Sequence, residues 1–297
     1  MRRRIQQSFS DQIFTILNYG LLTMAMLIVV YPLVFIISAS FSLPANVLTG
    51  KVWLFPVDFS LVSYQAVFKN KQILSGYMNS SIYVLAGTLI SVSLTILAAL
   101  PLSRKEFCGR NIFMSLFLFS MLFSGGLIPT YMLLRNLSMT NTRWAIILPN
   151  AVAVWLMIIT RTFFQHNIPD EIYEAAEIDG CDDLTFLYKM VIPLSGPIIA
   201  VIALNYAVWQ WNGYYDALIY LTDQRKYPLQ IVLRDILILN RVDINMMSDV
   251  ESMMRKQGLA VVLKYALIVV ASAPLLIIYP FVQKYFVKGI MIGSVKG

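Results

Sequence analysis

Residues 77–102 read YMNSSIYVLAGTLISVSLTILAALPL, an unbroken stretch that contains no Asp, Glu, Lys or Arg. A helix of this length can cross the roughly 30 Å hydrocarbon core of a bilayer. Across the chain, 58% of residues are hydrophobic and 13% are charged, whereas soluble domains carry about 25% charged residues. Only helices and closed barrels satisfy the backbone in lipid, and an uninterrupted apolar run favours the helix. The sequence therefore predicts an all-α membrane protein.

Other apolar stretches on both sides of this one extend the pattern to six transmembrane helices. The predicted spans are residues 19–40, 77–102, 112–134, 144–160, 198–220 and 265–286. The first span is longer than the apolar core of a signal peptide, so we expect it to be retained. Prolines lie inside or beside the spans, at Pro32, Pro101, Pro129, Pro149, Pro274 and Pro280. Kinked helices are expected, because neighbouring helices can satisfy the carbonyls that proline leaves free.

Basic residues at the ends of the spans predict the orientation of the chain. Arg2, Arg3 and Arg4 precede the first span, Arg104 and Lys105 follow the second, and lysines follow the sixth. Short cytoplasmic loops carry an excess of Lys and Arg, and long loops count little. Both termini are therefore predicted to be cytoplasmic, with outer segments at 41–76 and 221–264 and an inner loop at 161–197.

Several classes of function are disfavoured by the composition. The net charge of +7 collects at the ends of apolar runs rather than on an aromatic-interleaved face, so no nucleic-acid partner is expected. Cys108 and Cys181 both fall on the predicted cytoplasmic side, where a structural disulfide is not expected. His166, the only histidine, has no metal-ligating neighbours in the sequence. The chain has no phosphate-binding GxxxxGK[ST] run and no GxSxG, HExxH or CxxC motif, so we expect neither an enzyme nor a bound cofactor.

The inner loop is acidic where cytoplasmic loops are normally basic. Residues 166–197 read HNIPDEIYEAAEIDGCDDLTFLYKMVIPLSGP. Pro169 at a first helical position, acidic residues in the first turn, and Gly180 at a left-handed C-terminal cap predict a helix of about three turns. Asp182 can cap a second helix that Pro193 and Pro197 end. The pattern predicts a helix, a glycine turn and a second helix at the membrane face.

Two interpretations of the first of these helices stay open from its residues alone. Ala175 and Ala176 permit close approach by another surface, with Ile172 and Tyr173 as apolar anchors and charges at Glu174 and Asp179. The helix then suits docking to another protein. Alternatively, it is an amphipathic surface helix that packs under the bundle.

The spacing of Glu174-Ala175-Ala176, Asp179-Gly180 and Pro193 resembles the EAA loop of bacterial ABC importer permeases. The chain also resembles the carbohydrate-uptake, maltose-permease-like branch of this family, through Trp209, Trp211 and Asn212 and the closing residues FVKGIMIGSVKG. The segment SGGLIPTYMLL, from Ser124, is similar to the lipoprotein-sugar and complex-oligosaccharide subgroup of that branch. The resemblance implies a type I ABC importer permease fold. It places a first helix and outer loop in residues 1–70, the transmembrane domain in 71–290 with a coupling loop at 163–197, and a cytoplasmic tail in 291–297.

This resemblance implies a transport role and a set of partners. The chain would be a subunit of a binding-protein-dependent sugar importer in the bacterial plasma membrane. Its partners would be membrane lipid, a second homologous permease subunit, two cytoplasmic ATPase subunits that hold ATP and Mg²⁺, and an extracytoplasmic solute-binding protein. The coupling residues implied are Tyr173, Glu174, Ala175, Ala176, Asp179, Gly180 and Pro193.

The fifth span combines aromatic rings with amides, a combination that binds sugars through stacking and hydrogen bonds. The candidate pathway residues are Asn205, Trp209, Trp211, Asn212 and Tyr215. The aromatic belt of a membrane interface explains the same rings equally well. Asn212 is the residue most expected to face a pathway, because an amide that faces lipid is costly.

Two alternative transport classes remain. An amino-acid or peptide ABC permease shares the inner loop, although the closing residues and the Trp-Asn motif favour sugar. An ion-coupled secondary transporter or channel is expected to have buried acidic residues or paired half-helices near the midplane of the bilayer. The predicted spans are almost free of ionisable residues, which argues against that class.

Overall fold

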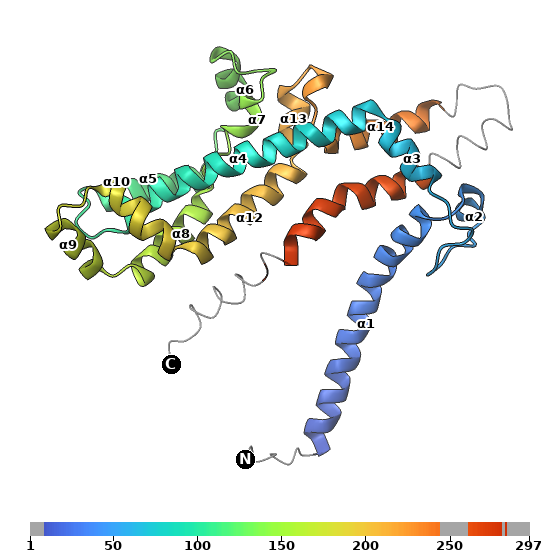
Figure 1. Cartoon of the computed structure of the whole chain (residues 1–297), viewed down its shortest axis with the longest axis horizontal. Coiled ribbons are helices and arrows are strands. Elements are labelled where there is room, and N and C mark those ends of the chain that lie inside the picture. The colour runs from blue at the N-terminus through green and yellow to red at the C-terminus, as the bar shows by residue number, and fades with distance from the viewer. Residues whose placement is uncertain (1–8, 244–260, 281–282, 284–297) are drawn as a thin grey trace. The chain divides into compact units, whose positions relative to one another are not determined.

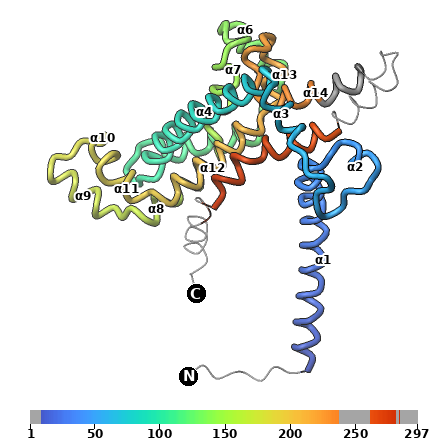
Figure 2. Tube along the Cα trace, turned by 45° about the vertical axis from the view of Figure 1, so that its right-hand side comes forward, coloured from blue at the N-terminus to red at the C-terminus, as the bar shows by residue number. Residues whose placement is uncertain are grey.

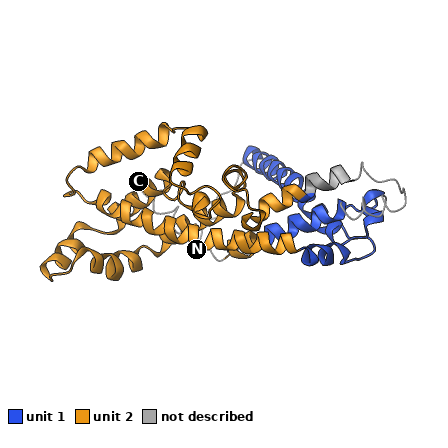
Figure 3. Cartoon of the chain, turned by 90° about the horizontal axis from the view of Figure 1, so that it is seen from above, with its two compact units in different colours: residues 1–70, 236–273 blue, residues 71–235, 274–297 orange. Residues whose placement is uncertain are grey.

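The computed structural model describes residues 9–243, 261–280 and 283 of the chain. Within these ranges the chain forms helices and no strand, apart from one isolated bridge between Ser42 and Phe59. Figure 3 shows two compact units, residues 1–70 with 236–273 and residues 71–235 with 274–297. The prediction of an all-helical chain is confirmed for the described residues.

The first unit is built on α1, Phe9–Ser40, a helix whose apolar side chains are mostly exposed. A helix that is apolar all round suits a lipid environment. After it come the short helices α2, Pro44–Leu48, and α3, Val62–Lys69. The ring of Phe41 stacks on Tyr64 at 4.8 Å, and the Tyr64 hydroxyl lies 2.8 Å from Ser40 Oγ. These contacts fold the segment after α1 back onto its end.

The second unit is organised around α4, Lys71–Ser103, which packs along α12, Gly196–Asn212, and α8, Val154–Asn167 (Figures 1 and 2). One phenol joins these helices. The Tyr206 hydroxyl lies 2.7 Å from Thr95 Oγ1 and accepts the Ala153 N–H at 3.0 Å. Tyr206 and Thr95 are buried, so these contacts replace the water that their polar groups lose.

Three described helices are long and apolar enough to cross a membrane by themselves: α1, α4 and Val261–Pro280. Two bent pairs raise the number to five if each pair is one span. They are α5, Arg110–Leu122, with α6, Leu127–Asn136, bent by 112°, and Asp183–Leu194 with α12, bent by 86°. The prediction of six spans is therefore not confirmed among the described residues.

The differences from the predicted spans have local causes. The third span breaks between α5 and α6, where Gly126 adopts φ +84°. The fourth divides into α7, Trp144–Ile147, and α8, with Pro149 in the break. The fifth divides at Gly213 into α12 and α13, Tyr215–Tyr220.

After α13, the second unit continues through the 3-10 turn η2, Gln224–Lys226, into the first residues of α14, Leu229–Asp243. Gly76 on α4 lies against α14, because a β-carbon there would stand 3.1 Å from Leu229 Cα. The Leu229 N–H donates to Ser80 Oγ at 2.8 Å. The closing residues FVKGIMIGSVKG, which include the predicted 291–297 tail, lie outside the described residues. So do residues 244–260 of the predicted outer segment and most of the last six residues of the sixth predicted span.

Candidate functional site

The first helix of the inner loop is α9, Asp170–Ile178. Pro169 precedes it at the N-cap position with φ −60°, one residue earlier than the spacing predicts. Asp170 and Glu171 occupy the first turn, where the helix dipole favours negative charge. Gly180 adopts φ +73°, so the predicted left-handed turn is confirmed.

The second inner helix begins as predicted and ends later. The Asp182 carboxylate accepts the Thr185 N–H at 3.3 Å. Hydrogen bonding with the Thr185 side chain and backbone lowers the pKa of Asp182. From there α10, Asp183–Phe186, leads through a π-helical turn, Leu187–Val191, to α11, Ile192–Leu194. Pro193 was predicted to end this helix but lies inside α11. A π turn widens the helix just before Pro193, which accommodates a residue without an N–H.

α9 has an exposed face and a packed face. Glu174, Ala175, Asp179 and Gly180 are exposed, as is Pro193 further along the loop. Ala176 is only 7% exposed and belongs to the core cluster that α4, α8 and α12 share. Ile172 and Tyr173 pack against that cluster as well. The two residues that looked like apolar anchors for a partner therefore attach α9 to its own bundle.

Ile178 is the large apolar residue on the exposed face of α9. Its side chain is 86% exposed, although it ends a helix attached to a well-packed core. Ile178 was not among the residues predicted to contact a partner. A signal for it was present, because Ile178 follows Glu174 by four positions and therefore shares its helix face. Acidic and apolar groups thus lie side by side on the exposed surface.

The candidate pathway residues on α12 and α13 divide in the same way. Trp209, Asn212 and Tyr215 are exposed. Asn205 is exposed too, and its amide donates within the helix to the Val201 carbonyl at 2.9 Å. Trp211 is 4% exposed and packs edge to face on Tyr77 with ring centroids 5.3 Å apart. In this conformation the Trp211 ring is therefore not offered to a substrate.

A small cavity beside Trp209 brings together polar groups that the sequence did not single out as a set. It is lined by Ile146, Asn150, Tyr206, Trp209, Gln210, Gly213 and Asp216. The Asn150 amide donates to Asp216 Oδ2 at 2.9 Å, which joins the break before α8 to α13. The cavity of about 20 Å³ has room for a water molecule and not for a sugar ring. Asn150 was detectable as an amide beside Pro149 in an apolar stretch.

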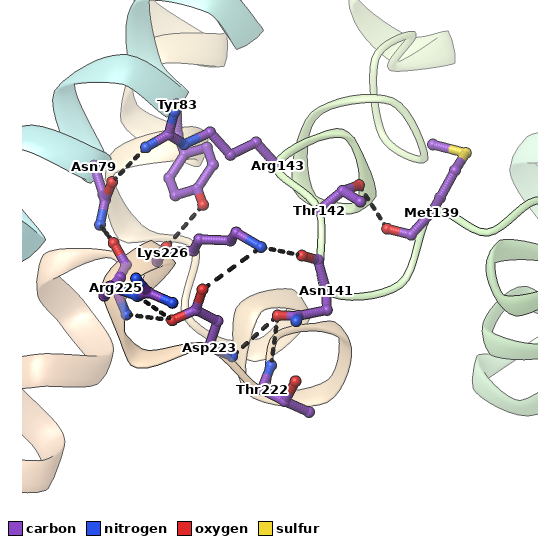
Figure 4. A network of polar contacts seen from close by, with 10 residues as sticks. All are labelled: Asn79, Tyr83, Met139, Asn141, Thr142, Arg143, Thr222, Asp223, Arg225 and Lys226. Atoms are coloured by element: carbon purple, nitrogen blue, oxygen red, sulfur yellow. Dashed lines mark hydrogen bonds and ion pairs between the residues drawn. The ribbon is translucent and has the colours of Figure 1, made fainter.

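A polar network near the N-terminal end of α4 holds the two neighbouring loops (Figure 4). Asn141, in a left-handed conformation with φ +58°, accepts the Thr222 and Asp223 N–H groups through Oδ1 at 3.1 and 3.0 Å. Its carbonyl accepts Lys226 Nζ at 2.7 Å. These bonds tie the segment after α6 to the segment after α13.

Two side chains of α4, those of Asn79 and Tyr83, complete this network. Asn79 donates to the carbonyls of Arg225 and Tyr227 at 2.7 and 3.1 Å, and the Tyr83 hydroxyl donates to the Lys226 carbonyl at 2.8 Å. Arg143 donates to Asn79 Oδ1 at 3.1 Å. The side chain of Arg225 itself stays 91% exposed. The network therefore fixes the loop backbone while it leaves a cation at the surface.

Several apolar helices long enough to cross a bilayer define a multi-pass membrane protein, and similarity to known proteins specifies the family. The chain belongs to the permease subunits of carbohydrate ABC transporters. It is 43% identical over 288 residues to the polygalacturonan/rhamnogalacturonan transport system permease protein YtcP of Bacillus subtilis (strain 168), with 97% of this chain and 99% of that protein covered. It is 39% identical over 289 residues to Protein LplC of the same organism, with 97% and 96% covered. No protein-family model matches the sequence.

A solved structure agrees with this assignment. A chain of a bacterial ABC transporter involved in the import of the acidic polysaccharide alginate matches with a TM-score of 0.84 and 33% identity, over 95% of this chain and 99% of that one. The protein is a multi-pass membrane permease subunit of an ABC importer for a sugar or oligosaccharide. Its role is transport rather than enzymatic catalysis.

Proposed function

We propose that this permease carries acidic oligosaccharides and takes its energy from ATPase subunits that dock on the coupling loop, residues 163–197. The observation that carries the docking proposal is the exposed face of α9. Glu174 offers a carboxylate for a charge-assisted hydrogen bond, and Ile178 offers an apolar group to bury beside it. Gly180 ends the helix in a turn where, apart from its two chain neighbours, no described residue has an atom within 4 Å of the β-position. That space is open to a partner.

The arrangement proposed for the complete importer follows the type I permease fold. In this proposal the chain has six spans and both termini are cytoplasmic. Its partners are a second homologous permease subunit, two ATPase subunits and an extracytoplasmic solute-binding protein. ATP and Mg²⁺ belong to the ATPase subunits. In the chain, residues 1–70 supply the first helix and outer loop, 71–290 the transmembrane domain and 291–297 the tail. The coupling residues are Tyr173, Glu174, Ala175, Ala176, Asp179, Gly180 and Pro193.

The substrate class is proposed from two similar proteins and from one feature of the outer loops. YtcP is named for polygalacturonan and rhamnogalacturonan, and the matched solved transporter imports alginate, so both handle acidic polysaccharides. The Arg225 side chain on the outer network is 91% exposed, although its Nε already donates to Asp223 Oδ1 at 3.2 Å. A guanidinium has five N–H donors, so Arg225 has further donors for a substrate carboxylate. On the inward route, the substrate passes Asn205, Trp209, Trp211, Asn212 and Tyr215, once α12 and α13 have moved enough to open the small cavity.

ATP-dependent uptake by proteoliposomes that hold the full complex tests both halves of the proposal. Galacturonate and mannuronate oligosaccharides are compared with neutral malto-oligosaccharides. We expect uptake of an acidic sugar, and preferential uptake of the neutral ones would contradict the substrate class. For docking, Glu174→Ala and Gly180→Tyr are expected to abolish uptake, whereas Glu106→Ala, which removes an exposed acid outside the coupling loop, leaves it unchanged. Full uptake by both loop variants would show that α9 is only a surface helix.

A further inference from the structure

Arg104, the first residue after α4, lies between two aromatic rings of the coupling loop. Its guanidinium carbon is 4.2 Å from the centroid of the Tyr173 ring on α9 and 5.0 Å from that of Phe186 on α10. The two rings meet edge to face, with centroids 5.2 Å apart and an interplanar angle of 85°. One cation therefore contacts both inner helices at once.

The rings are the main partners of this cation. Its Nη2 atom is buried and makes no hydrogen bond with any described residue. Phe186 is only 2% exposed, so the guanidinium is shielded from solvent on that side. Burial lowers the pKa of Arg104, and the Tyr173 hydroxyl and neighbouring acids oppose that effect. Partly desolvated cation–aromatic contacts are stronger than exposed ones.

The end of α4 that carries Arg104 is itself held by α8. Arg161 Nε donates to the Leu102 carbonyl at 2.8 Å, and Gln165 Nε2 donates to the Ser103 carbonyl at 3.3 Å. These bonds satisfy carbonyls that the end of a helix leaves free. Because α4 also packs along α12, Arg104 is fixed to the helices beside the candidate pathway.

We propose that Arg104 is a positioning residue that clamps the coupling loop to α4, so that a movement of α9 is passed to α4 and α12. This inference rests on the proposed docking of ATPase subunits and goes beyond it, because Arg104 is not on the docking face. Tyr173 is then the receiving side of the clamp rather than an anchor for the ATPase. Its hydroxyl donates to Asp183 Oδ1 at 3.2 Å, which keeps α9 and α10 together.

Lys105 provides a matched comparison at the next position. Its ammonium pairs with Asp170 of α9 at 2.9 Å, but its side chain is 81% exposed and that of Asp170 is 47% exposed. Exposed ion pairs contribute little, because water screens them and both side chains lose freedom. The clamp therefore resides in the stacked cation and not in the neighbouring ion pair.

The test measures sugar taken up per ATP hydrolysed by the assembled complex in proteoliposomes. We expect Arg104→Ala to lower this ratio at least about five-fold, while Lys105→Ala leaves it unchanged. Tyr173→Phe keeps the ring and is expected to retain most of the ratio, whereas Tyr173→Leu is expected to behave like Arg104→Ala. The double variant of Arg104→Ala and Tyr173→Leu is expected to lose no more than Arg104→Ala alone, because that change already removes the contact with the Tyr173 ring.

The outcomes separate this inference from the docking proposal. If Arg104 is purely structural, Arg104→Ala lowers the amount and thermal stability of the complex, and the complexes that do assemble keep the normal ratio of sugar taken up to ATP hydrolysed. That result overturns the clamp. Normal ratios in Arg104→Ala together with lost uptake in Glu174→Ala also overturn it, with docking intact. Normal uptake in all of these variants overturns docking itself. If Arg104→Ala does not assemble, the comparison of Tyr173→Leu with Tyr173→Phe decides, and equal ratios contradict the clamp.

Discussion

Gly87 on α4 lies directly against the side chain of Gln210 on α12, so that a β-carbon on Gly87 would stand 2.6 Å from Gln210 Nε2. Gln210 also lines the small cavity beside Trp209. The two longest packed helices of the second unit thus meet at a glycine, next to the proposed sugar pathway. Absence of a side chain at position 87 determines where the amide of Gln210 lies.

Gly87→Ala is expected to impair transport more than stability. Alanine favours a helix by roughly 1 kcal/mol over glycine, and the flexible Gln210 side chain can move away. That movement relocates the Gln210 amide at the cavity. We expect a normal melting temperature and reduced uptake, measured on the purified complex and on proteoliposomes. The double variant with Gln210→Ala serves as the control: if it transports as poorly as Gln210→Ala alone, the effect of Gly87 runs through Gln210.

Gly76→Ala is expected to destabilise the protein, because its new methyl group meets the backbone of Leu229 as well as the side chain of Val232. Leu229 Cα lies 3.1 Å and Val232 Cγ2 lies 3.0 Å from the β-position. Overpacking of this kind costs about 1–3 kcal/mol and would pull Leu229 from Ser80. Thermal unfolding of the purified permease measures the loss. Gly20→Ala in α1, where nothing lies within 4 Å, should not lower the melting temperature, and an equal loss in both variants would contradict this account.

Tyr206→Phe is expected to lower stability by about 1–3 kcal/mol. The change removes only the hydroxyl, which leaves buried Thr95 and the Ala153 N–H without their partner. Tyr188→Phe removes a hydroxyl from a side chain that is 66% exposed, so it should have no measurable effect. Denaturation of both variants in the same detergent compares them. A stable Tyr206→Phe protein would mean that water replaces the hydroxyl.

Gly180 allows the turn to be separated from docking. At φ +73°, Asn is tolerated, whereas a β-branched residue costs about 1–2 kcal/mol or more. Gly180→Val should therefore loosen the end of α9, measured by hydrogen exchange of residues 175–181. Gly180→Asn should keep that protection and place a side chain on the docking face. Loss of ATPase binding by Gly180→Asn with normal protection identifies the turn as a contact surface, while loss of protection in that variant contradicts this view.

The pH dependence of the second inner helix follows from Asp182. A lowered pKa means that the cap contributes to stability above the ordinary pKa of an aspartate, about 3.9, and that this contribution is lost as the pH falls through the lower folded value. We expect protection of the Thr185 amide, corrected for intrinsic exchange, to fall in that acidic window. Asp182→Asn keeps an oxygen acceptor and should remove the pH dependence. Identical profiles in both proteins would exclude the carboxylate as the cause.

Local features of the inner loop were predictable because their causes lie within a few residues. Gly180 takes the left-handed turn and Asp182 accepts the Thr185 N–H, as their positions in the sequence indicate. The continuation of the second helix through Pro193 was not predictable, because it follows a wider π turn, Leu187–Val191, that forms only in the folded segment. The breaks at Gly126 and Gly213 were not predicted either.

The amino-acid residues alone were enough to predict a helical membrane protein with an acidic loop, because hydrophobicity and helix caps act over one helix at a time. The permease role followed from the resemblance of its motifs to a known family. The direction in which the side chains face depended on how the helices pack. This packing turned Tyr173 and Trp211 inward and Ile178 outward, and it placed Arg104 between rings from two other helices. The physical reason is that a ring contacts either its own bundle or the outside according to how neighbouring helices pack, and residues far apart in the chain set that packing.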